Sequence, residues 1–206
     1  MEERKILTPN EVRNKHTAYL SKNPDLKEYI EKLEHQNITD PLTGLYNRRG
    51  FDEFFKHQCE MTQRYGQPFA ISMGDIDDFK SYNDEFGHDE GDRALVEISR
   101  CMQYNIRDTD RLCRYGGEEF TIIMPETKGD SAELVIERVR KNIEELELDC
   151  KVTMSFGLFC FPDDVFYVSD LMTDAIPLTD RALYYAKKTG KNRVCTVRFT
   201  AENNAL

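Results

Sequence analysis

Residues 111–124, RLCRYGGEEFTIIM, decide the fold, because they are two short apolar runs separated by Gly116-Gly117. Such a pattern predicts a β-hairpin, with a two-residue turn as its simplest geometry. A buried strand is predicted upstream at residues 69–74, FAISMG, and strong acids begin where it stops. Further strands are predicted at residues 151–161 and 193–199.

Helical patterns lie between these strands. Asn47 is expected to cap a helix whose apolar face carries Phe51, Phe54, Phe55, Gln58 and Thr62, and Gly66-Gln67-Pro68 ends it. Residues 83–92, NDEFGHDEGD, read as a glycine-punctuated loop before a helix that ends near residue 106. A later helix is predicted from the apolar spacing of Leu134, Ile136, Val139, Ile143 and Leu146. Two more are predicted at residues 168–175 and 179–189, separated by an interruption at Pro177. A hairpin mixed with helical crossovers predicts an α+β sandwich, in which helices cover a mostly antiparallel sheet.

The length of 206 residues fits one ordinary domain and about forty residues more. We expect an N-terminal helical extension over residues 1–38, a main domain over 39–200 and a disordered tail over 201–206. Asn23-Pro24 is a helix-start signal, and Leu26, Ile30 and Leu33 form a narrow apolar stripe after it. This helix either packs on the domain or pairs with a copy of itself in a coiled coil.

The charge of the chain argues against a nucleic-acid polymer as its partner. The formal net charge is −10, and residues 41–206 carry −9 of it, which repels a phosphate backbone. No apolar stretch approaches the ~20 residues that span a bilayer, so we expect a soluble, cytoplasmic protein without a membrane partner. Six cysteines stand singly, without C-x-x-C pairs, and are expected to be buried, reduced thiols.

Two pairs of acids follow apolar strands. Asp75 and Asp77 come after one strand and Glu118 and Glu119 after the hairpin turn, so four carboxylates are expected to converge. Hard oxygen ligands suit Mg²⁺ or Mn²⁺. Each pair alone would fit solvated turn acids, whereas the two pairs together favour a metal. Candidate phosphate-binding lysines are Lys80, Lys187 and Lys191, although helix C-capping also explains the last two.

Together these motifs resemble the GGDEF family of diguanylate cyclases. The matching blocks are residues 40–49 (DPLTGLYNRR), 75–80 (DIDDFK), 83–84, 86–88, 91–92, 114–120 (RYGGEEF), 155–157 and 182–187. The resemblance implies a palm-like or nucleotidyl-cyclase-like α+β domain with a five-stranded sheet. It also implies that two GTP molecules condense into cyclic di-GMP and two pyrophosphates, each 3′-hydroxyl attacking the α-phosphorus of the GTP on the facing subunit of a homodimer.

The resemblance assigns roles by position. It implies that two Mg²⁺ or Mn²⁺ ions per active site are held by Asp75, the carbonyl of Ile76 and Glu118, and that Glu118 or Glu119 helps to deprotonate the 3′-hydroxyl. It implies that Asn83 and Asp92 read the guanine edge with His88 beside them. It implies that the phosphates are bound by Lys80, Lys187, Lys191 and the backbone N–H groups of Asp78 and Phe79.

A second nucleotide site is implied by Arg107 and Asp110, an R-x-x-D pair five residues before the end of RLCRY. Its register matches the family's product-inhibition site, where cyclic di-GMP binds, although R-x-x-D is frequent by chance. Two departures from the common pattern stand at Glu118, where Asp is usual, and Lys191, where Arg is frequent; both keep the charge. The alternative to an active, feedback-inhibited enzyme is a non-catalytic module that binds GTP or cyclic di-GMP.

Overall fold

The structure is a computed structural model that describes residues 23–25, 38–148, 150–163 and 170–197. The chain divides into two compact units, Met1–Ile38 and Thr39–Leu206. In the first unit Pro24 and Asp25 are helical, while the predicted apolar stripe at Leu26, Ile30 and Leu33 lies outside the described residues, as does the predicted tail. No helix of the described part is long and apolar enough to cross a membrane.

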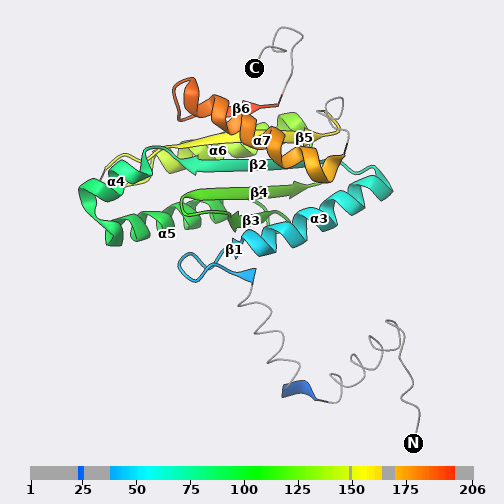
Figure 1. Cartoon of the computed structure of the whole chain (residues 1–206), viewed down its shortest axis with the longest axis horizontal. Helices are drawn as coiled ribbons and strands as arrows, with labels where there is room; N and C mark the ends of the chain where they lie inside the picture. The colour runs from blue at the N-terminus through cyan, green and yellow to red at the C-terminus, as the bar shows by residue number, and fades with distance from the viewer. Residues whose placement is uncertain (1–22, 26–37, 149, 164–169, 198–206) are drawn as a thin grey trace, which may run out of the picture. The chain divides into compact units, whose positions relative to one another are not determined.

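The second unit is built on one mixed sheet (Figure 1). Its strand order is β1-β3-β4-β2-β5-β6. The four inner strands pair antiparallel, and the outer pairs β1–β3 and β5–β6 are parallel. The strands are β1 (Tyr46–Asn47), β2 (Phe69–Ile76), β3 (Arg111–Arg114), β4 (Glu119–Pro125), β5 (Met154–Phe161) and β6 (Val194–Thr196).

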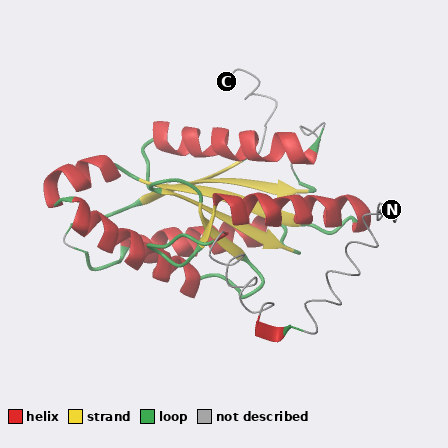
Figure 2. Cartoon of the chain, turned by 60° about the horizontal axis from the view of Figure 1, so that its bottom comes forward, coloured by secondary structure: helices red, strands yellow, loops and turns green. Residues whose placement is uncertain are grey.

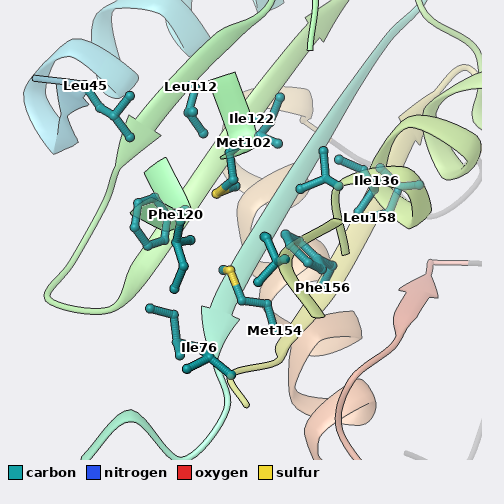
Figure 3. Close-up of a cluster of buried hydrophobic side chains, with 14 of the residues drawn as sticks. Leu45, Ile76, Met102, Leu112, Phe120, Ile122, Ile136, Met154, Phe156 and Leu158 are labelled. Atoms are coloured by element: carbon teal, nitrogen blue, oxygen red, sulfur yellow. The ribbon is translucent and has the colours of Figure 1, made fainter. Parts of the chain in front are cut away.

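Helices cover both faces of the sheet (Figure 2). They are α3 (Arg48–Tyr65), α4 (Phe79–Phe86), α5 (His88–Tyr104), α6 (Gly129–Glu144) and α7 (Leu171–Lys188). One apolar cluster joins α5 and α6 to side chains such as Phe120, Met154 and Phe156 (Figure 3). The other joins α3 and α7 to Phe69, Ile71 and Phe159. The predicted α+β sandwich is therefore confirmed, with the two-residue β1 added to the five expected strands.

Local signals fix the ends of α3 and the seat of α7. The Asn47 side chain accepts hydrogen bonds from the N–H groups of Arg49 and Gly50, and Gly66 ends the helix with φ 68°, both as predicted. At Gly157 a Cβ would overlap the backbone of Thr179 and Leu183, so α7 lies directly on β5. This contact holds the C-terminal end of α7 near the end of β2 that carries the acids.

Four predictions about elements are wrong, three of them because tertiary contacts override a local signal. β2 does not stop at Gly74 but continues through Asp75 to Ile76, since Ile76 still pairs with Met154. Residues 83–92 are not a loop but the end of α4 and the start of α5, joined by Gly87 alone. Four residues, 115–118, separate β3 from β4 instead of two, and Tyr115 N–H and Gly116 N–H both donate to the Glu119 carbonyl.

The fourth concerns Pro177, which lies inside one continuous α7. Buried Ala175, Thr179, Ala182 and Leu183 lie on both sides of the proline, and their packing outweighs the missing backbone hydrogen bond. Leu134, one of the residues from which α6 was predicted, is 73% exposed. The six cysteines are free thiols; Cys59, Cys113 and Cys160 are buried and the other three are half-buried.

Candidate active site

The site begins at the end of β2, on the face covered by α7. Side chains alternate along a strand, so Asp75 lies on the same face as Ile71 and Met73. The opposing residue on β4 is Glu119, and the Ile76 N–H donates to the carbonyl of Glu118 at 3.2 Å. Pairing of β2 with the hairpin turn thus brings the two predicted acidic segments side by side.

Asp75 and Glu118 form the electrostatic centre of the site. Asp75 is 8% exposed, and burial raises its pKa against the opposing effect of Lys187. Burial also raises the pKa of Glu118, and the negative charge of Asp75 raises it further. Lys187, in the last turn of α7, places Nζ 2.5 Å from Asp75 Oδ1. Two desolvated carboxylates therefore share one lysine.

Asp77 lies near enough for its charge to raise the pKa of Asp75, but its carboxylate oxygens are used in other hydrogen bonds, which corrects the expectation that four carboxylates converge on one metal site. Its Oδ1 accepts from Ser155 Oγ at 2.7 Å, and its Oδ2 accepts from Thr153 Oγ1 at 2.8 Å and from the Asn192 N–H at 3.0 Å. Among the described residues no group of three or more His, Cys, Asp and Glu side chains is arranged to hold a metal. Asp77 is a structural acceptor that ties β2 to β5 and to the loop after α7.

The loop after α7 presents Lys191 to the same end of β2. Lys191 and Asn192 both have positive φ, 58° and 45°, a conformation that favours Gly and Asn. Lys191 Nζ lies 2.6 Å from Asp78 Oδ1, a pair exposed to solvent. The loop is held from the other side by Arg140 of α6, whose Nη1 donates to Asn192 Oδ1 at 2.5 Å. Neither Arg140 nor Asn192 is predicted from the sequence, because no local pattern marks them.

The turn from β2 into α4 carries the next predicted residues. Asp78 has φ 57° and precedes Phe79, the first residue of α4, so their backbone N–H groups lie at the helix N-terminus. Lys80 is exposed in the first turn, and among the described residues its ammonium has no ion-pair partner. Asn83 follows one turn later and is therefore on the same side of α4.

Helix α5 brings two further predicted residues to one face. His88 is its first residue and Asp92 lies four residues on, so both are exposed on one side of the helix. Asp92 also lines a hollow of about 630 Å³ together with Leu42, Tyr82 and Leu148. Only Gly87 separates α4 from α5, and this places Asn83 beside Gly91.

The hairpin turn itself is held by Arg114 and Asp40, to which no role is assigned from the sequence. Arg114 donates from Nε and Nη2 to the Gly117 carbonyl at 3.1 and 2.7 Å. Its Nη1 lies 3.1 Å from Asp40 Oδ1. Burial raises the pKa of Asp40, but hydrogen bonds from Thr43 and Arg114 outweigh it and leave the pKa below its ordinary value. Asp40 and Arg114 thus connect the start of the domain to the turn that carries Glu118.

The R-x-x-D pair lies apart from these residues, in the segment between α5 and β3. Asp110 Oδ2 accepts from the Arg107 N–H at 2.9 Å, and the Asp110 N–H donates to the Arg107 carbonyl. Asp110 is 8% exposed, and its Oδ1 is buried without a hydrogen-bond partner among the described residues. The Arg107 side chain is exposed. The geometry fits a nucleotide-binding pair, although Asp110 also shapes its own turn.

Comparisons with known proteins identify the set of motifs. Residues 37–193 match the family described as diguanylate cyclase, GGDEF domain. The uncharacterized protein YhcK of Bacillus subtilis (strain 168) is 38% identical over 175 residues, covering 81% of this chain and 47% of that protein. This chain spans about half the length of the first curated relatives it matches.

Two solved structures share the fold. The diguanylate cyclase SiaD of Pseudomonas aeruginosa, crystallised with its activator SiaC, has a TM-score of 0.74 and 34% identity, covering 89% of this chain and 72% of that one. The active GGEEF domain of a diguanylate cyclase from Vibrio cholerae has a TM-score of 0.69 and 32% identity, covering 75% of this chain and 98% of that one.

Proposed function

Since the chain belongs to the GGDEF diguanylate cyclase family, we propose that it condenses two GTP molecules into cyclic di-GMP and releases two pyrophosphates. In each half-reaction a 3′-hydroxyl forms a bond to the α-phosphorus of the other GTP, and the bond from that phosphorus to pyrophosphate breaks. The proton of the hydroxyl passes to Glu118 or Glu119. The Vibrio cholerae domain, described as active, carries the same G-G-E-E-F motif as residues 116–120, which supports catalysis with Glu118 in place of Asp.

One observation carries the proposal: Asp75, Glu118 and Lys187 meet at the end of β2. Carboxylates buried this close repel one another unless cations balance them, and Lys187 balances only one. An arrangement of desolvated acids beside lysines suits phosphoryl and nucleotidyl transfer, where positioning and charge neutralisation supply most of the catalysis. A purely structural turn would not need it.

The donor set fits a divalent cation. Mg²⁺ is commonly bound through one or two carboxylates together with substrate phosphates, and Asp75, Glu118 and the Ile76 carbonyl supply such hard oxygens. Bound there, Mg²⁺ would neutralise phosphate charge during transfer. Lys187 is positioned to bind phosphate oxygens beside these ligands, and Lys80 and Lys191 approach from α4 and from the loop after α7. The N–H groups of Asp78 and Phe79 add uncharged donors.

Base recognition falls to α4 and α5. Asp92 accepts hydrogen bonds from the N1–H and N2–H₂ donors of guanine, which adenine lacks. Asn83 makes a second contact, and His88 lies on the same face of α5 as Asp92. These side chains project from two helices that a single glycine joins, so they reach the base from a rigid frame.

Assembly and feedback are the remaining parts of the proposal. Two GTP molecules must face each other, so the active form is a homodimer in which each protomer binds one GTP. Residues 1–38 aid that dimerisation, and Arg107 and Asp110 bind the product and inhibit the enzyme. Arg can bond guanine N7 and O6 while Asp accepts from guanine donors. The buried Asp110 Oδ1, which has no hydrogen-bond partner in the described part of the chain, supports this role.

Incubation with GTP and Mg²⁺, followed by chromatographic separation of the nucleotides, tests the proposal. We expect cyclic di-GMP and pyrophosphate from the wild-type protein, and no detectable turnover from Glu118→Gln, which removes the charge but keeps the shape. Glu97→Gln is the matched control, because Glu97 pairs with Arg100 on the exposed face of α5. Absence of cyclic di-GMP at high protein concentration would favour the non-catalytic nucleotide-binding module instead.

A further inference from the structure

Gly91 lies where a side chain would collide with Asn83. Gly91 is buried inside α5, and a Cβ built on it would overlap Oδ1 of Asn83 on α4. The same Cβ would lie 3.0 Å from Asn83 Cγ and 3.4 Å from Phe79 Cζ. Glycine is a poor helix former, and the first turns of α5 contain no bend that requires it. The absence of a side chain at Gly91 therefore leaves room for the Asn83 side chain of α4.

The carboxamide of Asn83 has a defined orientation in this space. Its Oδ1 is fully buried and receives no hydrogen bond from the described residues. Its Nδ2 also has no hydrogen-bond partner among the described residues, but unlike Oδ1 it is not fully buried. Because the two atoms point away from each other across Cγ, the oxygen sits against Gly91 and the amide N–H₂ faces outward. Asn83 thus presents a donor.

We propose that Gly91 is a positioning residue for base recognition, because it forms a notch that holds the Asn83 oxygen and turns the amide donor toward the guanine. The inference rests on the proposed function, in which Asn83 reads the base. Asn83 then offers a donor, while Asp92, the residue after Gly91, offers an acceptor. Guanine carries acceptors, O6 and N7, beside its N1–H and N2–H₂ donors, so a donor and an acceptor together match it.

A double-mutant cycle with Asn83→Ala, Gly91→Ala and the double variant tests the proposal, with KM for GTP as the readout. Loss of the Asn83 contact is expected to raise KM about three- to tenfold in Asn83→Ala. Gly91→Ala is expected to raise it to a similar degree, because the new Cβ displaces the carboxamide. The double variant should match Asn83→Ala, since the added methyl then meets only Phe79 Cζ, at an ordinary contact distance of 3.4 Å. Thermal unfolding should change little in Gly91→Ala, because the half-buried Asn83 side chain can turn away from the added methyl and alanine favours the helix.

Competition by inosine triphosphate, which lacks the 2-amino group, tests the orientation of the amide. That amino group is a donor, and the outward Nδ2 does not bind a donor, so the affinity ratio of GTP to inosine triphosphate should be the same in wild type and both single variants. A ratio that falls toward one in Asn83→Ala would show that Oδ1 contacts the amino group, and would overturn the proposal.

Two other outcomes separate this inference from the function it rests on. If Asn83→Ala raises KM but Gly91→Ala does not, or if the two effects simply add, the notch is refuted while the role of Asn83 stands. If Asn83→Ala leaves KM unchanged while cyclic di-GMP is formed, the assignment of Asn83 to the base fails, and the role of Gly91 fails with it.

Discussion

Removal of the Arg114 guanidinium should loosen the turn that carries Glu118. Arg114 makes two hydrogen bonds to the Gly117 carbonyl and one ion pair with Asp40, and both side chains are less than one-fifth exposed. Hydrogen bonds to charged groups contribute about 1.5–3 kcal/mol each in partly buried sites. Water can replace the guanidinium at the exposed Gly117, and Asp40 keeps its two hydrogen bonds from Thr43, so the loss is smaller than the sum of the separate interactions. We expect Arg114→Ala to lower the free energy of unfolding by about 2–3 kcal/mol.

The same substitution should lower kcat more than it raises KM. Gly117 precedes Glu118 directly, and a catalytic group displaced by about 1 Å loses on the order of a hundredfold in rate. Initial rates at saturating GTP, together with urea unfolding, separate the two effects. Arg100→Ala is the control, since its pair with Glu97 is exposed and should contribute less than about 1 kcal/mol. A destabilised Arg114→Ala protein with wild-type kcat would refute the view that Arg114 positions the turn.

Three further predictions follow from the geometry. Gly157→Ala should lower the free energy of unfolding, measured in urea, by about 3 kcal/mol, because the new Cβ would overlap backbone atoms of α7. An unchanged urea midpoint would contradict the direct contact between α7 and β5. In the folded protein the pKa of Asp40 lies below its ordinary value of 3.8, so the stabilising effect of its carboxylate is complete above pH 3.8 and is lost as the pH falls through the folded pKa. The difference in unfolding free energy between wild type and Asp40→Asn should therefore shrink from pH 6 to pH 3. A difference that does not change with pH would contradict this expectation. Arg107→Ala should keep the initial rate but relieve inhibition by added cyclic di-GMP. Asp110→Ala is less informative, because it would also disturb the turn in which Asp110 accepts the Arg107 N–H. Equal inhibition of Arg107→Ala and wild type would exclude Arg107 from the product site.

Sequence patterns predicted the parts of the fold that depend on neighbours in the chain. The Asn47 cap, the Gly66 stop and the apolar runs of the inner strands are local, and the structure confirms them. The predicted loop at residues 83–92 failed because its acids and glycines belong to exposed helix faces and to the notch at Gly91, features that need α4 and α5 side by side. The predicted interruption at Pro177 failed for the same reason, since packing on β5 keeps α7 continuous.

The candidate site was predictable in composition but not in geometry. Asp75, Glu118 and Lys187 were named from their spacing and from the family resemblance, and the structure brings them together. Asp77 stands in the same motif as Asp75, yet its carboxylate is used by Ser155, Thr153 and Asn192, which only strand pairing could reveal. Arg140 reaches Asn192 across the fold, and no local pattern predicts such a contact.

The balance of charge at the end of β2 links substrate binding to cation binding. Five carboxylates and three lysines lie in the segments around this end of the strand: Asp75, Asp77, Asp78, Glu118 and Glu119, and Lys80, Lys187 and Lys191. Lys187 and Lys191 are already paired with Asp75 and Asp78, so a triphosphate must compete with those acids for the lysines. A divalent cation on Asp75 and Glu118 would release Lys187 toward phosphate. Under the proposed function, GTP and the cation therefore raise each other's affinity, as reciprocal coupling requires. The acid excess that disfavours a nucleic-acid polymer is thus compatible with tight binding of its monomer.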